Sequence, residues 1–140
     1  MRGSLCQSVA AVGAASGEPA TRIVLVDDDS DSREIFAMFL RMSGFEVDDF
    51  ESAESALESI RTAVPAVVVV DIEMDGLDGY EAGRHVRAIK SVTPVRIIAV
   101  TGHAAATVKM KGGDLFDAIL TKPVDPDAFI ALVQKLLSPS

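Results

Sequence analysis

The sequence is short of cysteine, of basic residues and of long apolar runs, and each shortage excludes a class of protein. The single cysteine, Cys6, cannot form an internal disulfide, which excludes a disulfide-stabilised domain and suits a reducing cytoplasm. Lys and Arg number 13 against 21 Asp and Glu, and the net charge of −8 argues against a general nucleic-acid surface. No segment approaches the roughly 18–20 apolar residues that span a bilayer. We therefore expect a cytoplasmic protein that neither binds nucleic acid directly nor inserts into a membrane.

The chain has the length and composition of one folded domain. Its 140 residues are enough to bury a hydrophobic core, and a hydrophobic content of 49% excludes global disorder. Residues 1–20 are rich in Gly, Ala and Ser. They resemble a secretory signal peptide only weakly, because their apolar stretch is poor in Leu, Ile and Phe. We expect residues 1–20 to be a flexible tail or a cloning remnant, and residues 21–138 to form a single domain.

From Thr21 onward, short apolar segments alternate with segments of helical periodicity. Five segments are typical of strands in a parallel sheet, namely residues 22–26, 45–50, 66–70, 95–100 and 118–120. Five strands that alternate with helices indicate a parallel sheet covered by helices on both faces. In such sheets, ligands bind beyond the carboxyl ends of the strands.

The first helix has recognisable ends. Ser30 or Asp31 is expected to be its N-cap, and Gly44 stands where the helix should end. Five apolar residues are expected to share its buried face: Ile35, Phe36, Phe39, Leu40 and Met42. The pattern therefore predicts a helix that packs on the sheet through that face.

The later helices differ in the strength of their signals. Ser52 fits an N-cap of the second helix, and Asp125 fits an N-cap of the last. A third helix is expected near residues 80–90. Two consecutive glycines weaken the pattern within residues 102–116, so the fourth helix is expected to be short or irregular.

Polar side chains stand at the carboxyl ends of four predicted strands, in the chain order Asp27 and Asp28, Asp71, Thr101, and Lys122. Two carboxylates about 4 Å apart repel each other by roughly 1 kcal/mol in water and about 4 kcal/mol at an effective dielectric of 20. Three carboxylates together therefore need compensating cations, and Lys122 supplies only one positive charge. Mg²⁺ is the natural complement, because it accepts one or two carboxylates together with a phosphoryl oxygen.

Each of these residues has an ordinary interpretation when it is taken alone. An Asp or Ser at a strand end often caps the following helix, and this is our interpretation of Asp29 or Ser30. A lone Thr or Lys at a strand end is common. Their joint occurrence at successive strand ends is what favours a functional site.

Five short motifs occur in a specific order along the chain: VDDD at 26–29, VVVVD at 67–71, MDGLDG at 74–79, VTG at 100–102 and LTKP at 120–123. Together they resemble the receiver domain of bacterial response regulators in two-component phosphorelay systems, of the type found in chemotaxis regulators. The resemblance covers roughly residues 22–137. It implies a flavodoxin-like, doubly wound sheet of five parallel strands in the order 2-1-3-4-5.

The resemblance assigns a phosphoacceptor and a metal site. Asp71 matches the acceptor, a carboxylate nucleophile that forms an acyl phosphate. Asp28 and Asp71 match direct Mg²⁺ ligands, with the backbone carbonyl of Glu73 as a third ligand and Asp27 acting through water. The expected cofactor is therefore Mg²⁺.

The resemblance also assigns the residues that bind the phosphoryl group and respond to it. Lys122 matches a residue that pairs with Asp71 and with a phosphoryl oxygen, and Thr101 matches a hydroxyl donor to the same group. Gly102 leaves space beside Thr101 for the hydroxyl to move. The bond between Lys122 and Pro123 matches a cis peptide of the family.

Two further residues and two of the departures from the family pattern bear on the expected function. By the resemblance, Glu73 and His103 flank the path of the water that hydrolyses an acyl phosphate, and they are expected to tune dephosphorylation. Asp75 stands where the family usually has Pro, and Ile119 stands where many members have an aromatic residue that rotates on activation. We therefore expect the response to centre on Thr101.

The expected function is signalling by phosphorylation. The domain is expected to take a phosphoryl group from a histidine kinase or a histidine phosphotransfer protein onto Asp71 and to switch a protein-interaction surface. It is expected to act on a downstream partner or within a parent multidomain chain. We expect no enzymatic activity beyond catalysis of its own phosphorylation and dephosphorylation.

Two alternatives remain open at the level of the sequence. One is a receiver-like docking domain that is not phosphorylated. The other is a Mg²⁺-dependent aspartyl phosphohydrolase. Such an enzyme needs an acid/base Asp two residues after its nucleophile, and Glu73 occupies that position.

Overall fold

The computed structural model describes residues 21–74, 78–90 and 94–138. Its strands are β1 (Arg22–Val26), β2 (Glu46–Phe50), β3 (Val67–Asp71), β4 (Arg96–Thr101) and β5 (Ala118–Thr121). Its helices are α2 (Ser30–Met42), α3 (Ala53–Thr62), α4 (Gly79–Ala88), α5 (Ala105–Gly112) and α6 (Pro126–Leu137). The predicted tail over 1–20 and the departure at Asp75 lie outside the described residues.

The five strands form one parallel sheet in the order β2-β1-β3-β4-β5. This order confirms the predicted doubly wound fold. Neighbouring parallel strands need a crossover connection, and one helix lies between each strand and the next along the chain. The strand order reverses between β1 and β3, because the chain first moves outward to β2 and then returns past β1.

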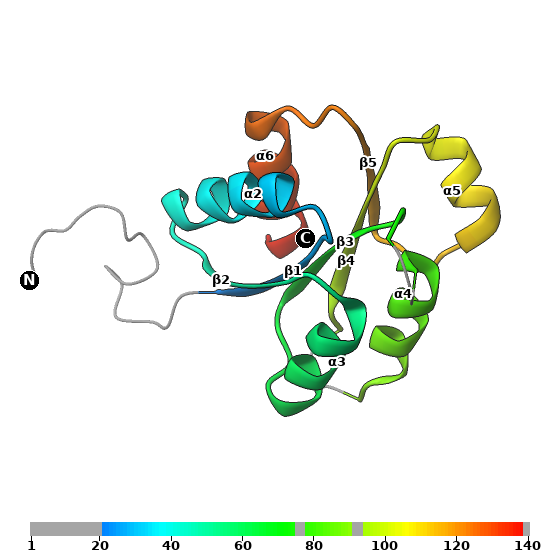
Figure 1. The fold of residues 1–140 in the computed structure, drawn as a ribbon, viewed down its shortest axis with the longest axis horizontal. Helices are drawn as coiled ribbons and strands as arrows, with labels where there is room; N and C mark the ends of the chain where they lie inside the picture. The colour runs from blue at the N-terminus through cyan, green and yellow to red at the C-terminus, as the bar shows by residue number, and fades with distance from the viewer. Residues whose placement is uncertain (1–20, 75–77, 91–93, 139–140) are drawn as a thin grey trace, which may run out of the picture.

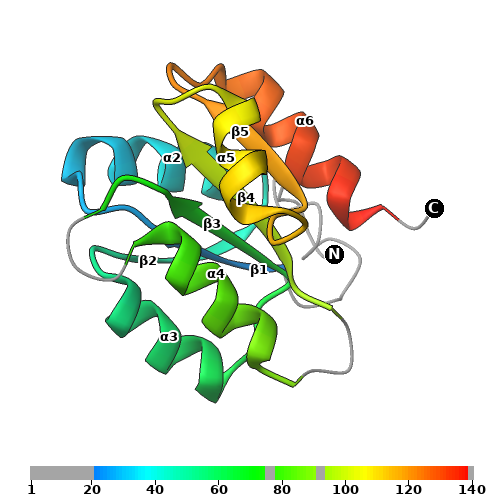
Figure 2. The same ribbon diagram turned by 90° about the vertical axis from the view of Figure 1, so that its right-hand side faces the viewer.

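Helices cover both faces of the sheet (Figures 1 and 2). α2 and α6 lie on one face, and α3, α4 and α5 lie on the other. Successive residues of a strand point to opposite faces, so the core has two parts. Leu25 and Val69 pack with α2 and α6, whereas Val24 and Val68 pack on the opposite face. Burial on both faces explains the uninterrupted apolar sequence of β3.

The N-cap of α2 differs from the prediction. Asp29, and not Ser30 or Asp31, caps this helix, because its carboxylate accepts a hydrogen bond from the backbone N–H of Ser32 at 3.0 Å. Hydrogen bonds from Ser32 also lower the pKa of Asp29. The expectation of Ser30 or Asp31 as the N-cap is therefore wrong, whereas the separate interpretation of Asp29 as an ordinary helix cap is confirmed.

The buried face of α2 also differs from the prediction. Ile35 and Met42 are 48% and 73% exposed, although we expected them to face the core. Ala37 and Leu40 are buried instead. These two residues are three positions apart and lie on one side of the helix, which is the side that packs on the sheet. The apolar residues of α2 extend around more of the helix than the sheet covers.

The other elements agree closely with the prediction. Every strand lies within one residue of its predicted bounds. Ser52 and Asp125 are the N-caps of α3 and α6. α5 has only eight residues and is followed by Gly113 with a φ of 60°, which confirms a short fourth helix. Within the described residues, no helix is both long and apolar enough to cross a membrane.

The start of α4 lies against the carboxyl end of β3. A Cβ atom at Gly79 would lie 2.8 Å from the Cα of Ile72 and 2.9 Å from the backbone oxygen of Asp71. Only glycine allows the two backbones to approach so closely. The first turn of α4 is thus held directly beside the strand end that carries Asp71.

Candidate functional site

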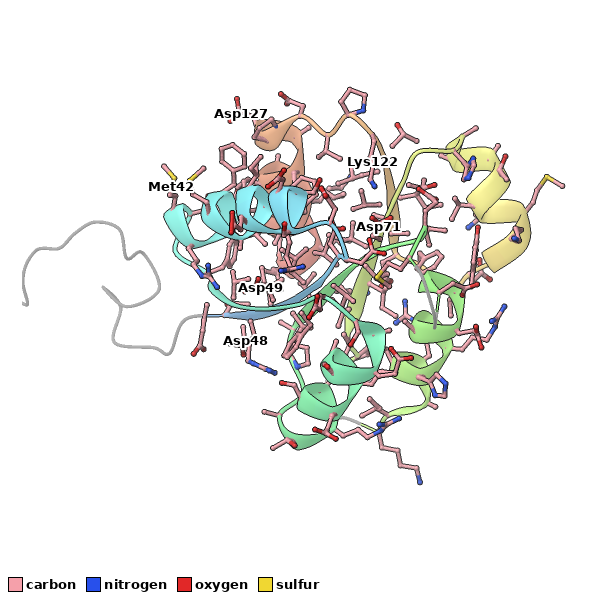
Figure 3. The ribbon with its side chains drawn as sticks, viewed as in Figure 1. Met42, Asp48, Asp49, Asp71, Lys122 and Asp127 are labelled. Atoms are coloured by element: carbon pink, nitrogen blue, oxygen red, sulfur yellow. The ribbon has the colours of Figure 1, made fainter. Side chains whose placement is uncertain are left out.

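The carboxyl ends of four parallel strands meet at one edge of the sheet. Val26 of β1 pairs with Val70 of β3, so the acidic residues that follow these two valines are neighbours. Figure 3 shows that Asp71, at the end of β3, and Lys122, just after β5, lie close together at this edge. The edge collects five of the residues predicted for the site: Asp27, Asp28, Asp71, Thr101 and Lys122.

Three carboxylates form a candidate metal site. Oxygen atoms of Asp27, Asp28 and Asp71 all lie within 4.8 Å of one another. Asp27 and Asp71 are 2% and 3% exposed, whereas Asp28 is exposed to solvent. Hard oxygen ligands with one side open to water fit Mg²⁺, which binds to few protein groups and keeps several waters.

The surroundings of Asp27 disfavour the ionised form of its carboxyl group. Burial raises the pKa of Asp27 to about 6, and the carboxylate of Asp71 adds to the rise. The backbone N–H of Asp29 opposes this effect by donating a hydrogen bond to Asp27 Oδ1 at 3.0 Å. The two buried carboxylates, Asp27 and Asp71, carry like charges, and this favours binding of a cation between them.

Lys122 provides the positive charge closest to the acceptor. Its Nζ donates a hydrogen bond to Asp71 Oδ2 at 3.0 Å, and its backbone N–H donates to the backbone oxygen of Thr101 at 2.7 Å. Burial lowers the pKa of Lys122, but the hydrogen bond and the charge of Asp71 outweigh this and raise it on balance. The peptide bond to Pro123 is cis, as predicted.

The two oxygens of Asp71 have different partners. Oδ2 accepts the hydrogen bond from Lys122, and Oδ1 accepts one from the backbone N–H of Glu73 at 3.0 Å. The carboxylate is therefore fixed in orientation at the end of a buried strand. One side of it faces the ammonium group, and carboxylate oxygens of Asp27 and Asp28 lie nearby.

Glu73 makes a contact that the sequence did not predict. Its Oε2 accepts a hydrogen bond from the Thr101 hydroxyl at 2.6 Å, and its Oε1 accepts one from the Gly102 backbone N–H at 2.7 Å. Thr101 is fully buried, and its Oγ1 also accepts the backbone N–H of His103 at 3.0 Å. The carboxylate of Glu73 thus accepts hydrogen bonds from Thr101 and Gly102, the two residues that the resemblance assigns to phosphoryl binding and to the conformational response.

The strand register explains why Glu73 reaches this position. Asp71 pairs with Val100 of the neighbouring strand, so the residues after Asp71 run beside the residues after Val100. An acid two positions beyond Asp71 can therefore meet Thr101 and Gly102. The sequence does not give this register, so the contact could not be inferred from the sequence alone.

His103 lies close to Glu73. The two residues line an open cavity of about 270 Å³ together with Ile72, Asp78, Tyr80, Thr107 and Lys111. The Nζ of Lys111 lies 5.0 Å from the centre of the Tyr80 ring, which is a cation–π distance. Burial raises the pKa of Tyr80. Sequence reasoning identified neither Tyr80 nor Lys111 as part of this region.

Comparison with known proteins identifies one family over most of the chain. A family model described as response regulator receiver domain matches residues 23–134. The chain is 34% identical over 116 residues to an uncharacterised 14.6 kDa protein of Leptolyngbya boryana, with coverage of 81% of this chain and 87% of the relative.

Longer relatives match over only part of their length. Response regulator Rre1 of Synechocystis is 33% identical, with coverage of 83% of this chain and 51% of Rre1. The DNA-binding transcriptional regulator NtrC of Klebsiella pneumoniae is 32% identical, with coverage of 81% of this chain and 24% of NtrC. The chain thus spans about half of the first protein and about a quarter of the second.

Solved structures share the fold. The chemotaxis protein CheY4 of Vibrio cholerae has a TM-score of 0.80 at 23% identity, with coverage of 85% of this chain and all of CheY4. The receiver domain of the sensor histidine kinase PA1611 of Pseudomonas aeruginosa has a TM-score of 0.75 at 25% identity, with coverage of 84% and 98%. That receiver domain was solved with a magnesium ion coordinated in its active-site cleft.

Proposed function

We propose the function of this site from one premise, which is that the chain belongs to the family of response regulator receiver domains. As a receiver domain it serves two-component signal transduction, and we propose that Asp71 is the residue that accepts the phosphoryl group. The observation that carries this assignment is the Asp71 carboxylate. It is 3% exposed, it lies 3.0 Å from the Lys122 ammonium, and two further carboxylates lie beside it.

The proposed reaction needs an oriented nucleophile and neutralised charge. A carboxylate oxygen of Asp71 forms a bond to phosphorus, and the bond from phosphorus to the histidine nitrogen of the donor breaks. The ammonium of Lys122 lies where it can neutralise part of the charge on the transferred group. The Thr101 hydroxyl and the Gly102 backbone N–H are the donors at the end of β4 that we propose bind the phosphoryl oxygens.

We propose that Asp28, Asp71 and the backbone carbonyl of Glu73 hold Mg²⁺, with Asp27 acting through water. When bound, the ion supplies positive charge to oxygens of the phosphoryl group. The three clustered carboxylates and the raised pKa of Asp27 support this proposal, because both favour a cation at the site.

We also propose the partners and the place of action. The phosphodonor is a histidine kinase or a histidine phosphotransfer protein, as for other two-component receivers. The signal passes to a downstream protein or to further domains of a longer chain, since relatives such as Rre1 and NtrC extend beyond the matched region. The cytoplasm is the proposed compartment, in keeping with the single Cys6.

The phosphohydrolase alternative gains no support from Glu73. That mechanism requires an acid/base carboxylate, two residues after the nucleophile, that is available to the leaving group. Both carboxylate oxygens of Glu73 instead accept short hydrogen bonds from Thr101 and Gly102. We therefore retain catalysis only of the domain's own phosphorylation and dephosphorylation.

Phosphorylation by a small donor tests the assignment of Asp71. With acetyl phosphate and Mg²⁺, the wild-type protein is expected to gain one hydroxylamine-sensitive phosphoryl group, measured by intact mass. Asp71→Asn is expected to gain none. Asp125→Asn is the matched control, because it neutralises an exposed acid that caps α6 and is not part of the carboxylate cluster, and it should be labelled like wild type. Labelling of Asp71→Asn at the wild-type level would remove Asp71 from this role.

The same labelled protein tests the proposed tuning residues. We propose that Glu73 and His103 influence the loss of the phosphoryl group, because both border the cavity beside the end of β4. After the donor is removed, Glu73→Ala and His103→Ala are each expected to change the decay rate by about threefold, which is on the order of 0.7 kcal/mol in the barrier. Decay at the wild-type rate in both variants would contradict this role.

A further inference from the structure

The carboxylate of Glu73 holds two hydrogen-bond donors at the end of β4. Its two oxygens accept from the Thr101 hydroxyl at 2.6 Å and from the Gly102 backbone N–H at 2.7 Å. Hydrogen bonds to a charged acceptor are stronger than neutral ones, and short distances are typical of them. One anionic side chain therefore satisfies both donors at the same time.

We propose that Glu73 is a positioning residue that occupies the phosphoryl-binding donors in the unphosphorylated protein and leaves them when Asp71 is phosphorylated. This inference rests on the proposed function, because it assumes that Thr101 and Gly102 bind the phosphoryl group. Two anionic groups cannot use the same hydroxyl proton and the same backbone N–H together. Phosphorylation must therefore displace the carboxylate.

The backbone of Glu73 keeps the carboxylate beside the acceptor. The Glu73 N–H donates to Asp71 Oδ1 at 3.0 Å, so the residue is attached to the carboxylate that becomes phosphorylated. The side chain then extends toward the end of β4, where its carboxylate contacts Thr101 and Gly102. The negative charge of Glu73 also contributes to the raised pKa of Lys122, which indicates that the carboxylate lies within the electrostatic reach of the phosphoryl site.

An open cavity next to Glu73 has space for its carboxylate after displacement. Glu73 is an exposed residue and lines the open cavity of about 270 Å³ described above. His103 and Lys111 line the same cavity. Rotation of the Glu73 side chain can therefore move its charge toward the Lys111 ammonium without a change in the fold.

Beryllofluoride measures the competition directly, because this anion binds an acceptor carboxylate in place of a phosphoryl group. In the presence of Mg²⁺, Glu73→Ala is expected to bind beryllofluoride about tenfold more tightly than wild type, since two charge-assisted hydrogen bonds no longer have to be broken. Glu73→Gln keeps an acceptor oxygen without the charge and is expected to lie between the two. Glu81→Ala removes an exposed acid from the first turn of α4 and is the matched control, expected to stay within about twofold of wild type.

A second background separates competition for donors from simple charge repulsion. In Thr101→Ala, one of the contested donors is absent, so the additional change Glu73→Ala is expected to improve beryllofluoride affinity by about threefold or less. Repulsion between Glu73 and the anion does not depend on the Thr101 hydroxyl. An equal gain in both backgrounds would therefore overturn the proposal.

The contact can also be observed in the free protein. The Gly102 amide proton is expected to resonate downfield in wild type, because it donates to a carboxylate at 2.7 Å, and to move upfield in Glu73→Ala. Wild-type affinity in Glu73→Ala, or an unchanged Gly102 resonance, would overturn the inference while the proposed function stands. Failure of wild type and every variant to bind beryllofluoride would overturn the proposed function, and this inference with it.

Discussion

At Asp27, the requirements of the site reduce the stability of the fold. It is 2% exposed and lies beside the carboxylate of Asp71, and its pKa is raised to about 6. The folded state therefore binds a proton at Asp27 more tightly than the unfolded state does. The stabilisation from this proton is present at low pH and is lost as the pH rises through about 6. At neutral pH, the ionised Asp27 destabilises the fold.

Replacement of Asp27 by Asn should relieve this effect. Without Mg²⁺ at pH 7.5, Asp27→Asn is expected to raise the free energy of unfolding by about 1 kcal/mol, measured by urea denaturation. The advantage should shrink below about pH 5, where Asp27 of the wild-type protein is protonated. Asp125→Asn provides the control, because it neutralises an exposed helix cap. A variant less stable than wild type at pH 7.5 would contradict the electrostatic interpretation.

At the scale of elements, the inner strands β1, β3 and β4 were predictable because burial on both faces leaves a nearly continuous apolar run. The starts of α3 and α6 followed from Ser52 and Asp125, whose side chains satisfy free backbone N–H groups at the helix start. The rotation of α2 was not predictable. Its apolar residues lie on several sides, and the face that packs on the sheet is set by tertiary contacts at Ala37 and Leu40.

The junction between β3 and α4 requires a residue without a side chain, which is Gly79. Gly79→Ala is expected to lower the free energy of unfolding by about 2 kcal/mol, because the added methyl group would lie 2.8 Å from the Cα of Ile72. Gly102→Ala is the comparison, since a Cβ there would meet only the Glu73 carboxylate at 3.6 Å. Thermal denaturation of the two variants distinguishes them. Equal stability would show that the close approach at Gly79 relaxes easily.

At the scale of the whole molecule, the candidate site exists only because distant segments end at one edge of the sheet. The five predicted residues could be placed there from strand order alone, since parallel strands share a direction. The contact of Glu73 with Thr101 could not, because it depends on the register between β3 and β4 and on one side-chain rotamer. The ends of strands can be predicted from a sequence, whereas the orientation of a single carboxylate depends on tertiary packing.

Metal binding should act on the stability of the entire domain. Mg²⁺ is expected to raise the midpoint of thermal unfolding, because an ion that binds only the native state stabilises it. Asp28→Asn should need about tenfold more Mg²⁺ for the same rise, since it removes a charged ligand. Asp29→Asn is the matched control, because its side chain caps α2 and lies outside the carboxylate cluster. Equal Mg²⁺ dependence of wild type and Asp28→Asn would place the ion elsewhere.

The hydrogen bond between Lys122 and Asp71 joins two parts of the sheet that differ in how readily they open. β3 is buried at every position and paired on both sides, so its amides should exchange with solvent slowly. β5 is an edge strand of four residues, and its side chains, including Ile119, are only partly buried or exposed. Local opening of β5 should therefore be far more frequent than opening of β3. A chemical change at Asp71 is thus linked, through the lysine that directly follows β5, to an edge strand whose amide exchange rate can change readily.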